Sequence, residues 1–563
     1  MRPARGDRAS DDPPCSLEVN RTATPGVGEA SLLRYRAVCC AGLLAALSAA
    51  SPAGAQATSQ ERATPLWGTL EPGPHAVGFR TLLLYDPSRP ALPSDDGTPP
   101  GPEARRRGRQ MAIFLWYPAR AGGGTPLRVG DYVDLLARAF DFAPLDSARR
   151  TDARRLFARQ AADLGGDTVS LRAALPAILR LTTAARANAP AAAGRHPLVL
   201  FPEYRAPATN GVMAEYLASH GFVVASSRLA GTFEADPDIS TRGLETQAAD
   251  LRFVLAALDS VPFVDRGRLA AMGVGITASG ALAFQMRTPE VDAFVSLEGG
   301  VTTEGEIEML RRSPYFDVAA ARVPMLAIHA PHPDVDANRL DLYRYSTRHL
   351  VHFPGMGEFW FLDYGPLERH APRIIGAPPG DVAAGFAWAA RWVRGFLRAQ
   401  LAGDSAALAA LLAGPPPGPF TAERREGLPA PPPLSGLRAL VRRDGVPAVV
   451  ALYRARRPRD PQPIPAEHLA DLASRLGREG RDPDWSGRRA LAELRVESDP
   501  ASARAHFALG SAALQAGDTA AARRHLAEAL RLLPADPDPT LGPAARGRLE
   551  RRARETLGRL GGG

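Results

Sequence analysis

The sequence predicts an α/β domain with a mostly parallel sheet flanked by helices, followed by a small all-α domain. Three observations predict it. Short apolar runs alternate with amphipathic helical segments from residue 196 to 402. A strand, a tight glycine turn and a helix succeed one another in "AAMGVGITASGALAF", residues 270–284. Helical patterns fill the chain beyond a proline-rich stretch. Strands that alternate with helices pair in parallel and are covered on both faces.

Length and composition agree with more than one domain. The chain has 563 residues and 45% hydrophobic content, which exceeds one ordinary domain and suffices for a sizeable core. No lysine is present, so all 68 basic residues are arginine, and the net charge is +8. These arginines alternate with 60 acidic residues and form no repeated basic face. We therefore expect no nucleic-acid partner.

The N-terminus has the layout of a secretory signal. Residues 34–57 contain arginines, an apolar run of about 14 residues and then Ala53-Gly54-Ala55 before Gln56. A membrane-spanning helix needs roughly 20 apolar residues, so cleavage fits better than an anchor. We predict a polar extension plus signal peptide over 1–55, a periplasmic or extracellular location, and no membrane span after removal. The mature chain would lack disulfides and thiolate metal sites, because the cysteines all precede the cut: Cys15, Cys39 and Cys40.

The first predicted elements are strands and helices at the start of an α/β domain over 56–402. Residues 66–89 alternate apolar and polar side chains around Pro-Gly turns, which favours an antiparallel hairpin, and 110–119 is a further strand. Residues 131–190 have helical periodicity with weak caps. They are either a cap over a substrate site or helical packing on a sheet edge.

The alternating strands and helices come next. We predict helices near 211–219, 241–259 and 379–402. The apolar runs that predict strands lie at 196–201, 221–227, 268–274, 291–297, 323–330 and 348–353.

The C-terminal part begins after a proline-rich linker, predicted over 403–436. In the helical domain over 437–563, residues 503–534 have the spacing of a tetratricopeptide repeat, with small or apolar residues at the contact positions of two antiparallel helices. A preceding copy ends at Pro500, about one 34-residue repeat before Pro534. The repeats are either a groove for a protein partner or a structural appendage. The repeat positions are Leu509, Gly510, Ala513, Gly517, Ala522, Leu526, Ala529 and Pro534.

The glycine turn and the segments around it resemble a known family. The chain is similar to secreted bacterial α/β hydrolases of the dienelactone hydrolase and platelet-activating-factor acetylhydrolase type, some with C-terminal tetratricopeptide repeats. The resemblance covers roughly 66–534. It implies an α/β-hydrolase fold and ester hydrolysis by a Ser-His-Asp triad. The segments that carry it are "GPHAVGFRTLLLYDPSR", "LWYPA", "HPLVLF", "LASHGFVVASS", "VDAFVSLEGG", "VPMLAIHA" and "FPGMGEFWFLDYG", together with the turn.

The family's catalytic positions carry other residues in this chain. Gly275 stands where the family places serine, Glu298 where it places aspartate and Glu358 where it places histidine. Glycine has no atom that can attack, and a triad needs an imidazole to move the proton, so only the acid keeps its chemical type. The equivalents of the oxyanion loop are Glu203 and Tyr204, with the Ile276 amide after the turn.

Other polar residues near the turn offer alternatives. Thr277 and Ser279 lie in the first helical turns, where a hydroxyl either caps and packs or attacks as a nucleophile. Glu298 and Glu358 would activate water if they met over Gly275, and two like charges would raise the pKa of one of them.

The segment "HAPHPDVD" contains residue types that bind metal. His329, His332, Asp334 and Asp336 follow a predicted strand, but two prolines interrupt any regular ligand spacing. We predict no metal and no cofactor. The turn "GVGITASG" does not fit a dinucleotide loop, because its third glycine comes two positions late.

These observations predict an exported α/β-hydrolase-fold protein with a degenerate triad at Gly275, Glu298 and Glu358. We expect it to bind an ester-like small molecule or a protein partner without catalysis. The alternative is an active carboxylic-ester hydrolase with a non-standard nucleophile or a carboxylate-activated water.

Overall fold

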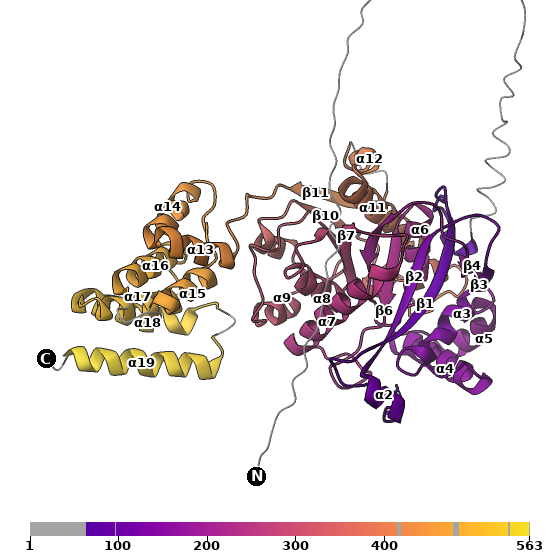
Figure 1. Ribbon diagram of the computed structural model, residues 1–563, viewed down its shortest axis with the longest axis horizontal. Helices are drawn as coiled ribbons and strands as arrows, with labels where there is room; N and C mark the ends of the chain where they lie inside the picture. Colours follow the sequence, from indigo (N-terminus) through magenta and orange to yellow (C-terminus); the bar gives the residue numbers. More distant parts are fainter. Residues whose placement is uncertain (1–63, 96, 414–417, 477–483, 539–540, 562–563) are drawn as a thin grey trace, which may run out of the picture. The chain divides into compact units, whose positions relative to one another are not determined.

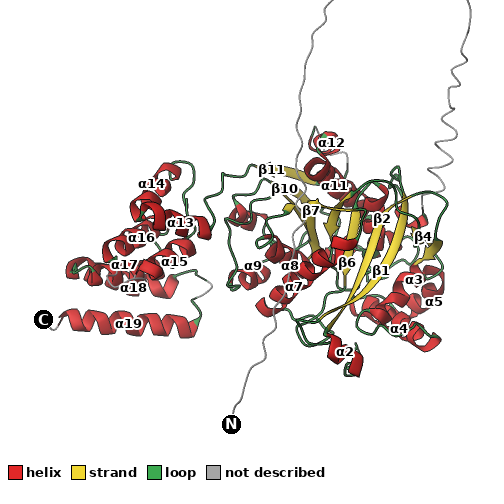
Figure 2. Cartoon of the chain, viewed as in Figure 1, coloured by secondary structure: helices red, strands yellow, loops and turns green. Residues whose placement is uncertain are grey.

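The computed structural model describes residues 64–95, 97–413, 418–476, 484–538 and 541–561. The predicted signal segment, 1–55, lies outside these ranges. The described chain has an α/β part, in which a sheet lies between helices, and an all-helical C-terminal part (Figures 1 and 2). The structure confirms the prediction of a mixed α/β region followed by a helical region.

The sheet of the described chain is largely parallel and has 11 strands. Its central strands, from β6 to β10, pair in parallel, as the alternation of strands and helices predicts. This arrangement is consistent with the α/β-hydrolase fold. Across the sheet the order is β11 (Thr421–Arg425), β10 (Arg348–His352), β9 (Met325–His329), β8 (Val291–Leu297), β7 (Val264–Val274), β5 (His196–Leu200), β6 (Val223–Ser227), β2 (Arg109–Ala119), β1 (Ala76–Asp86), β4 (Thr182–Ala187) and β3 (Thr125–Arg128).

The hairpin predicted within 66–89 is wrong. Residues 76–86 form the single strand β1, which pairs antiparallel with β2 from Ala76 opposite Ala119 to Asp86 opposite Arg109. In the described residues of the connection between them there is one short helix, α2 (Pro102–Arg107). Every residue of β2 is buried, so burial of a long apolar strand selects the partner of β1, and the local Pro-Gly turns do not.

Both faces of the sheet are covered by helices that the periodicity predicts. Along β7, Ala270 and Met272 belong to the core that includes α6 and α11, whereas Leu269 and Ala271 belong to the core that includes α7 and α8. This alternation follows from the two-residue period of a strand. Ser240 caps α7 by accepting a hydrogen bond from the Gly243 amide at 3.3 Å. The helices are α6 (Gly211–Ser219), α7 (Thr241–Ala257), α8 (Ile276–Gln285) and α11 (Val382–Ala402).

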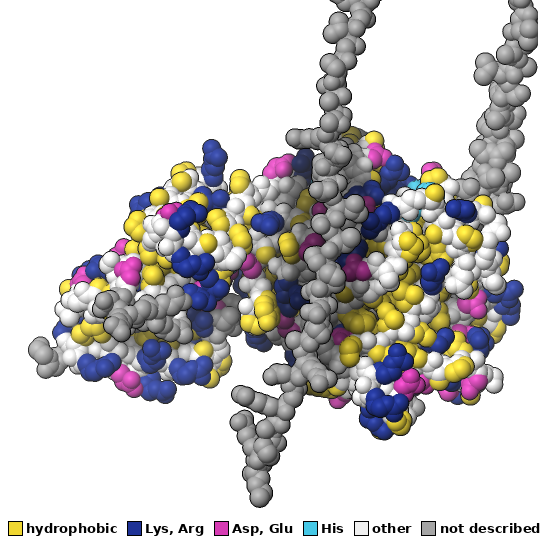
Figure 3. Space-filling model, viewed as in Figure 1, with side chains coloured by type: hydrophobic (Ala, Val, Ile, Leu, Met, Phe, Trp, Pro, Cys, Tyr) yellow, Lys and Arg dark blue, Asp and Glu magenta, His cyan; other side chains and the backbone are white. Residues whose placement is uncertain are grey.

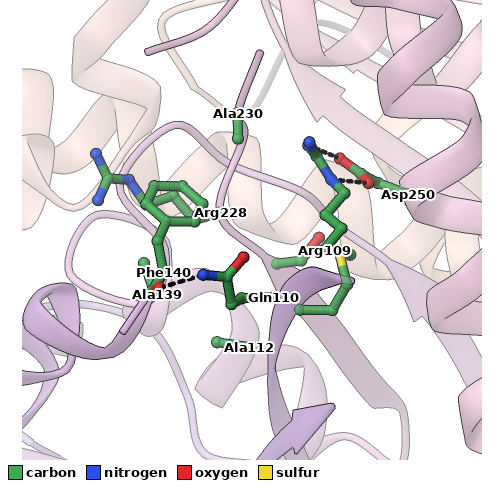
Figure 4. A pocket seen from close by; sticks show the side chains of 10 residues that line it. Arg109, Gln110, Ala112, Ala139, Phe140, Arg228, Ala230 and Asp250 are labelled. Carbon is green, nitrogen blue, oxygen red and sulfur yellow. Dashed lines mark hydrogen bonds and ion pairs between the residues drawn. The ribbon is translucent and has the colours of Figure 1, made fainter. Parts of the chain in front are cut away.

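The region 131–190 contains helices and one strand of the sheet. Its elements are α3 (Val129–Asp134), α4 (Ser147–Asp163), α5 (Thr168–Ile178) and β4. Figure 4 shows a small pocket at its junction with the sheet. There the Gln110 amide donates to the Phe140 carbonyl at 2.9 Å, and the Arg228 guanidinium lies 4.8 Å from the centre of the Phe140 ring. Beside it, Arg109 makes two 2.9 Å hydrogen bonds to Asp250.

Within the segment predicted as a linker, 403–436, the structure has a helix, α12 (Ala406–Leu412), and the edge strand β11, which pairs antiparallel with β10. The helical part then follows. In it, α17 and α18 approach closely at Gly510, where a Cβ would lie 2.8 Å from Leu526 Cγ. Its helices are α13 (Leu434–Asp444), α14 (Val446–Arg456), α15 (Ala466–Leu476), α16 (Trp485–Ser498), α17 (Ala503–Gln515), α18 (Thr519–Leu532) and α19 (Pro543–Gly561).

The surface mixes charges of both signs. On the face shown in Figure 3, arginine side chains lie among acidic and apolar ones. Among the residues that the structure describes, no helix combines the length and the apolar character that crossing a membrane requires.

Candidate functional site

The turn between β7 and α8 is built around Gly275. This residue has φ 51° and ψ −127°, a conformation that side chains rarely adopt. Its amide donates to the carbonyls of Leu297 at 2.9 Å and Glu298 at 2.7 Å. The Thr277 hydroxyl accepts from the Val274 amide at 2.8 Å and donates to the Val274 carbonyl at 2.9 Å. Thr277 therefore fixes the turn, and its hydroxyl faces the backbone.

The carboxylate of Glu358 lies over the turn. It belongs to the short helix η5 (Glu358–Phe361), which follows β10. A Cβ on Gly275 would lie 2.6 Å from Glu358 Oε1 and 4.0 Å from the Glu298 carbonyl oxygen. The structure thus brings together the three residues that the sequence resemblance aligns with a triad, and a carboxylate occupies the space into which a side chain at 275 would project.

Glu298 is held at the end of β8 in a left-handed conformation, with φ 46°. Glu298 is only 3% exposed, and its Oε2 accepts a hydrogen bond from the Ala330 amide at 2.5 Å. The pKa of Glu298 is raised to about 7, chiefly by burial and also by the charges of Glu358 and Glu306, while the Ala330 hydrogen bond opposes the increase. Glu298 and Glu358 are therefore electrostatically coupled.

Glu306 is a third carboxylate at this site that sequence reasoning missed. It lies on α9 (Glu304–Arg311), and its Oε2 accepts from the Gly300 amide at 2.6 Å and from the Thr303 hydroxyl. A Cβ on Gly299 would lie 3.1 Å from Glu306 Oε2 and 3.5 Å from Gly275 Cα, which places Glu306 beside the turn.

The sequence signal at Glu306 points to a helix start, because Thr303-x-x-Glu306 is the pattern of a capping box. Nothing in that pattern distinguishes a carboxylate that caps a helix from one that also lies in a site. The pKa of Glu306 is raised to about 7 by burial and by the charge of Glu358, while the Gly300 hydrogen bond opposes the increase.

His332 is the imidazole that acts electrostatically on Glu358. Burial raises the pKa of Glu358, and the charge of His332 opposes this. The His332 side chain is 50% exposed, and its Nδ1 accepts from the Asp334 amide at 3.2 Å. An imidazole is therefore near the carboxylates, on the loop after β9.

The other predicted candidates have partners within the fold. The Ser279 hydroxyl is fully buried and donates to the Gly300 carbonyl at 2.8 Å. Asp336 Oδ1 accepts from the Asn338 amide at 2.9 Å at the start of a 3₁₀ helix, whereas the Asp334 side chain is 76% exposed. These positions do not bring an additional nucleophile to the turn.

His329 pairs with a histidine on the neighbouring strand. Its Nδ1 lies 3.3 Å from His352 Nδ1, and burial, with the charge of His352, lowers the pKa of His329 to about 4. No three or more His, Cys, Asp or Glu residues of the described ranges are grouped so that they could hold a metal ion.

The predicted oxyanion loop carries its own buried carboxylate. Glu203 Oε2 accepts from the Arg205 amide at 2.6 Å and from the Thr209 hydroxyl, and burial raises the pKa of Glu203. The Arg205 guanidinium lies 3.7 Å from the centre of the Tyr204 ring. Ile276, as the first residue of α8, has an amide that no carbonyl within the helix can accept. The Glu203 carboxylate therefore forms its hydrogen bonds within its own loop.

Replacement of Gly275 by alanine tests the backbone of the turn. We expect Gly275→Ala to lower the free energy of unfolding by about 1–3 kcal/mol, because a Cβ is strained at this φ and ψ. The contact with Glu358 adds little, since the end of a flexible side chain can move. Urea unfolding followed by tryptophan fluorescence measures the change.

The matched control is Gly305→Ala in α9, where a Cβ meets nothing within 4 Å. This change should stabilise the protein by up to about 1 kcal/mol, since alanine is a better helix former than glycine. Equal stability of Gly275→Ala and the unmodified protein would contradict the described turn.

The raised pKa of Glu298 predicts a pH-dependent stability. Its folded pKa of about 7 exceeds the value of 4.5 for the free side chain, so the folded state binds more protons between these values. The contribution is fully present below about pH 4.5 and is lost as the pH rises through 7. Glu298→Gln stays neutral, so its stability relative to the unmodified protein should increase by about 1–3 kcal/mol from pH 5 to pH 8. Urea unfolding at each pH measures this.

The control is Glu304→Gln on α9, because the Glu304 side chain is 79% exposed. Its stability difference from the unmodified protein should stay within about 0.5 kcal/mol across the same range. A Glu298→Gln difference that is flat from pH 5 to 8 would show that Glu298 is not a buried, proton-holding group.

Comparisons with known proteins find similarity to solved structures. Neither a protein-family model nor a curated protein matches the chain. The chain is similar to the structure of a ferulic acid esterase from Streptomyces cinnamoneus, at 20% identity and a TM-score of 0.42. The match covers 62% of this chain and 96% of the esterase.

Proposed function

We propose that this chain is an exported α/β-hydrolase-fold protein that has lost ester hydrolysis and binds an ester-like small molecule at the Gly275 turn. The observation that carries the proposal is the position of Glu358 Oε1, 2.6 Å from the point where the Cβ of a nucleophile would lie. A carboxylate in this place cannot act as the imidazole of a triad, which accepts a proton at one nitrogen while its other nitrogen is held by the acid. The secretory signal is the sequence basis for export.

The amide geometry of the turn supports binding. The Ile276 amide at the start of α8 is a donor, and the neighbouring carboxyl groups of Glu298 and Glu358 donate when protonated and accept when ionised. An ester or amide has acceptor oxygens that match these donors. The like charges of three carboxylates disfavour an anionic ligand.

We also propose that the helical C-terminal part is a tetratricopeptide-like domain. Its support is the repeat spacing of 503–534 and the close approach of α17 and α18 at Gly510, the small-residue position of the repeat. Such a domain offers a surface to a protein partner.

A second candidate function is ester hydrolysis by a carboxylate-activated water. The observation that favours it is the pKa of Glu298, raised to about 7 by burial and by the other carboxylates, because a general base works best when its pKa is near the operating pH. In this candidate Glu298 would take a proton from water near Gly275. It needs no side chain at residue 275.

Ester hydrolysis and active-site labelling separate the two functions. Under the first proposal the full chain should hydrolyse short-chain nitrophenyl esters at the buffer rate and take up no fluorophosphonate probe, because it has no nucleophile at the turn. Product absorbance and gel fluorescence measure these. Hydrolysis above the buffer rate that is lost in Glu298→Gln would overturn the first proposal and support the second. Labelling of any side chain would contradict both.

Restoration of the triad tests the alignment of the site. We expect Gly275→Ser with Glu358→His to take up the fluorophosphonate probe and to hydrolyse nitrophenyl esters slowly, since the hydroxyl, an imidazole and Glu298 would then lie at one turn. Gly275→Ala with Glu358→His is the matched control, which differs by the hydroxyl alone and should stay inactive. A folded but unlabelled serine variant would show that these residues do not form a triad geometry.

A further inference from the structure

Two histidines face each other in the helical C-terminal part. His506 lies on α17 and His525 on α18, and their Nδ1 atoms are 3.1 Å apart. The ring centres are 5.3 Å apart, with 33° between the ring planes. Because α17 and α18 pack closely at Gly510, their backbones hold the two rings at this separation. The pair lies far along the chain from Gly275, so it is independent of the proposed function.

A carbonyl fixes the orientation of one ring. His506 is only 8% exposed, and its Nε2 lies 3.1 Å from the Pro500 carbonyl oxygen. A carbonyl can only accept, so Nε2 carries the hydrogen and the Nδ1 lone pair of neutral His506 points towards His525. Metal-binding histidines show this arrangement, in which the second ring nitrogen donates to a carbonyl or carboxylate and sets the tautomer.

The environment keeps His525 available as a ligand. Its side chain is half-buried, so the ring remains accessible to an ion from solvent. Its charged neighbours are Arg524, Glu493 and Arg489, and Glu493 forms a 2.9 Å ion pair with Arg489. The charge around His525 therefore does not itself attract a cation, and the two imidazoles carry the proposal.

The separation of the two nitrogens suits one metal ion. Imidazole nitrogens bind Zn²⁺ at about 2.0–2.1 Å, so two of them lie about 2.9 Å apart at a right angle and about 3.3 Å apart at the tetrahedral angle. The observed 3.1 Å falls between these values. We propose that His506 and His525 form a two-imidazole site for a divalent transition-metal ion, with Zn²⁺ as the reference ion and water in the remaining coordination positions.

The competing arrangement is a hydrogen bond between two neutral rings, in which His525 Nδ1–H donates to His506 Nδ1. It predicts no metal binding at the pair. The chain also provides an internal control, because His329 and His352 have Nδ1 atoms 3.3 Å apart at the ends of β9 and β10. Removal of each pair in turn assigns any bound ion to one location.

The test uses the full chain, purified without a polyhistidine tag and freed of metal with a chelator. Zn²⁺ titration calorimetry at neutral pH should give a binding step whose affinity falls more than about tenfold in His525→Gln and in His506→Gln. Cu²⁺ electron paramagnetic resonance of the unmodified chain should show hyperfine coupling to two imidazole nitrogens. The double variant His329→Gln, His352→Gln should keep this binding step, and any further step that it loses belongs to the His329–His352 pair, whose 3.3 Å separation falls in the same range.

Three outcomes would overturn the site: no Zn²⁺ binding, unchanged affinity in His525→Gln, or loss of binding only in the His329 and His352 double variant. Circular dichroism checks that each variant is folded. Because His506 is buried and His525 is half-buried, His525→Gln decides the matter if His506→Gln does not fold.

Discussion

The site depends on the backbone of one turn, in which Gly275 adopts a conformation that disfavours side chains while β7 passes into α8. Several bonds hold the turn independently of any nucleophile. The Thr277 hydroxyl bridges both polar groups of Val274, and the Gly275 amide reaches two carbonyls at the end of β8. Gly273 allows the close approach, since a Cβ there would lie 2.3 Å from the Ala278 amide nitrogen. The turn is thus held by these bonds with only a hydrogen as the side chain of residue 275.

Around this turn the fold buries three carboxylates, which is costly unless protons or donors compensate. A hydrogen bond from the Ala330 amide offsets part of the cost of burying Glu298, and one from the Gly300 amide does the same for Glu306. These donors belong to loops at the same edge of the sheet, where the parallel strands end. The remaining cost appears as raised pKa values, about 7 for both groups. A proton is therefore part of the structure of the site at neutral pH and below.

The sequence is informative where periodicity and turn residues act locally. Helices α6 and α7 begin at the predicted residues, because apolar spacing and the Ser240 cap are local signals. The pairing of β1 with β2 is different, since it depends on the burial of β2 across a long connection. Likewise β11, "TAERR", has no apolar alternation and is an edge strand only because β10 offers it a partner.

The same distinction applies within the site. The positions of Gly275, Glu298 and Glu358 can be named from the sequence because each follows a strand at a recognisable motif. Their proximity cannot be derived from spacing, and Glu306 enters from a helix whose first turn resembles any capping box.

Hydrolysis and binding make different demands on these groups. A triad needs a side chain that accepts a proton in one step and returns it in the next, which an imidazole does at neutral pH. Glu358 lies beside Gly275, at the position that the sequence resemblance aligns with that group, and burial favours its protonated form. A protonated carboxyl is a hydrogen-bond donor, so Glu358 can hold an acceptor oxygen at the turn without a nucleophile to attack the adjacent carbon. The residues at positions 275 and 358 are therefore compatible with each other, because the hydrogen at residue 275 leaves the room that the Glu358 carboxylate occupies.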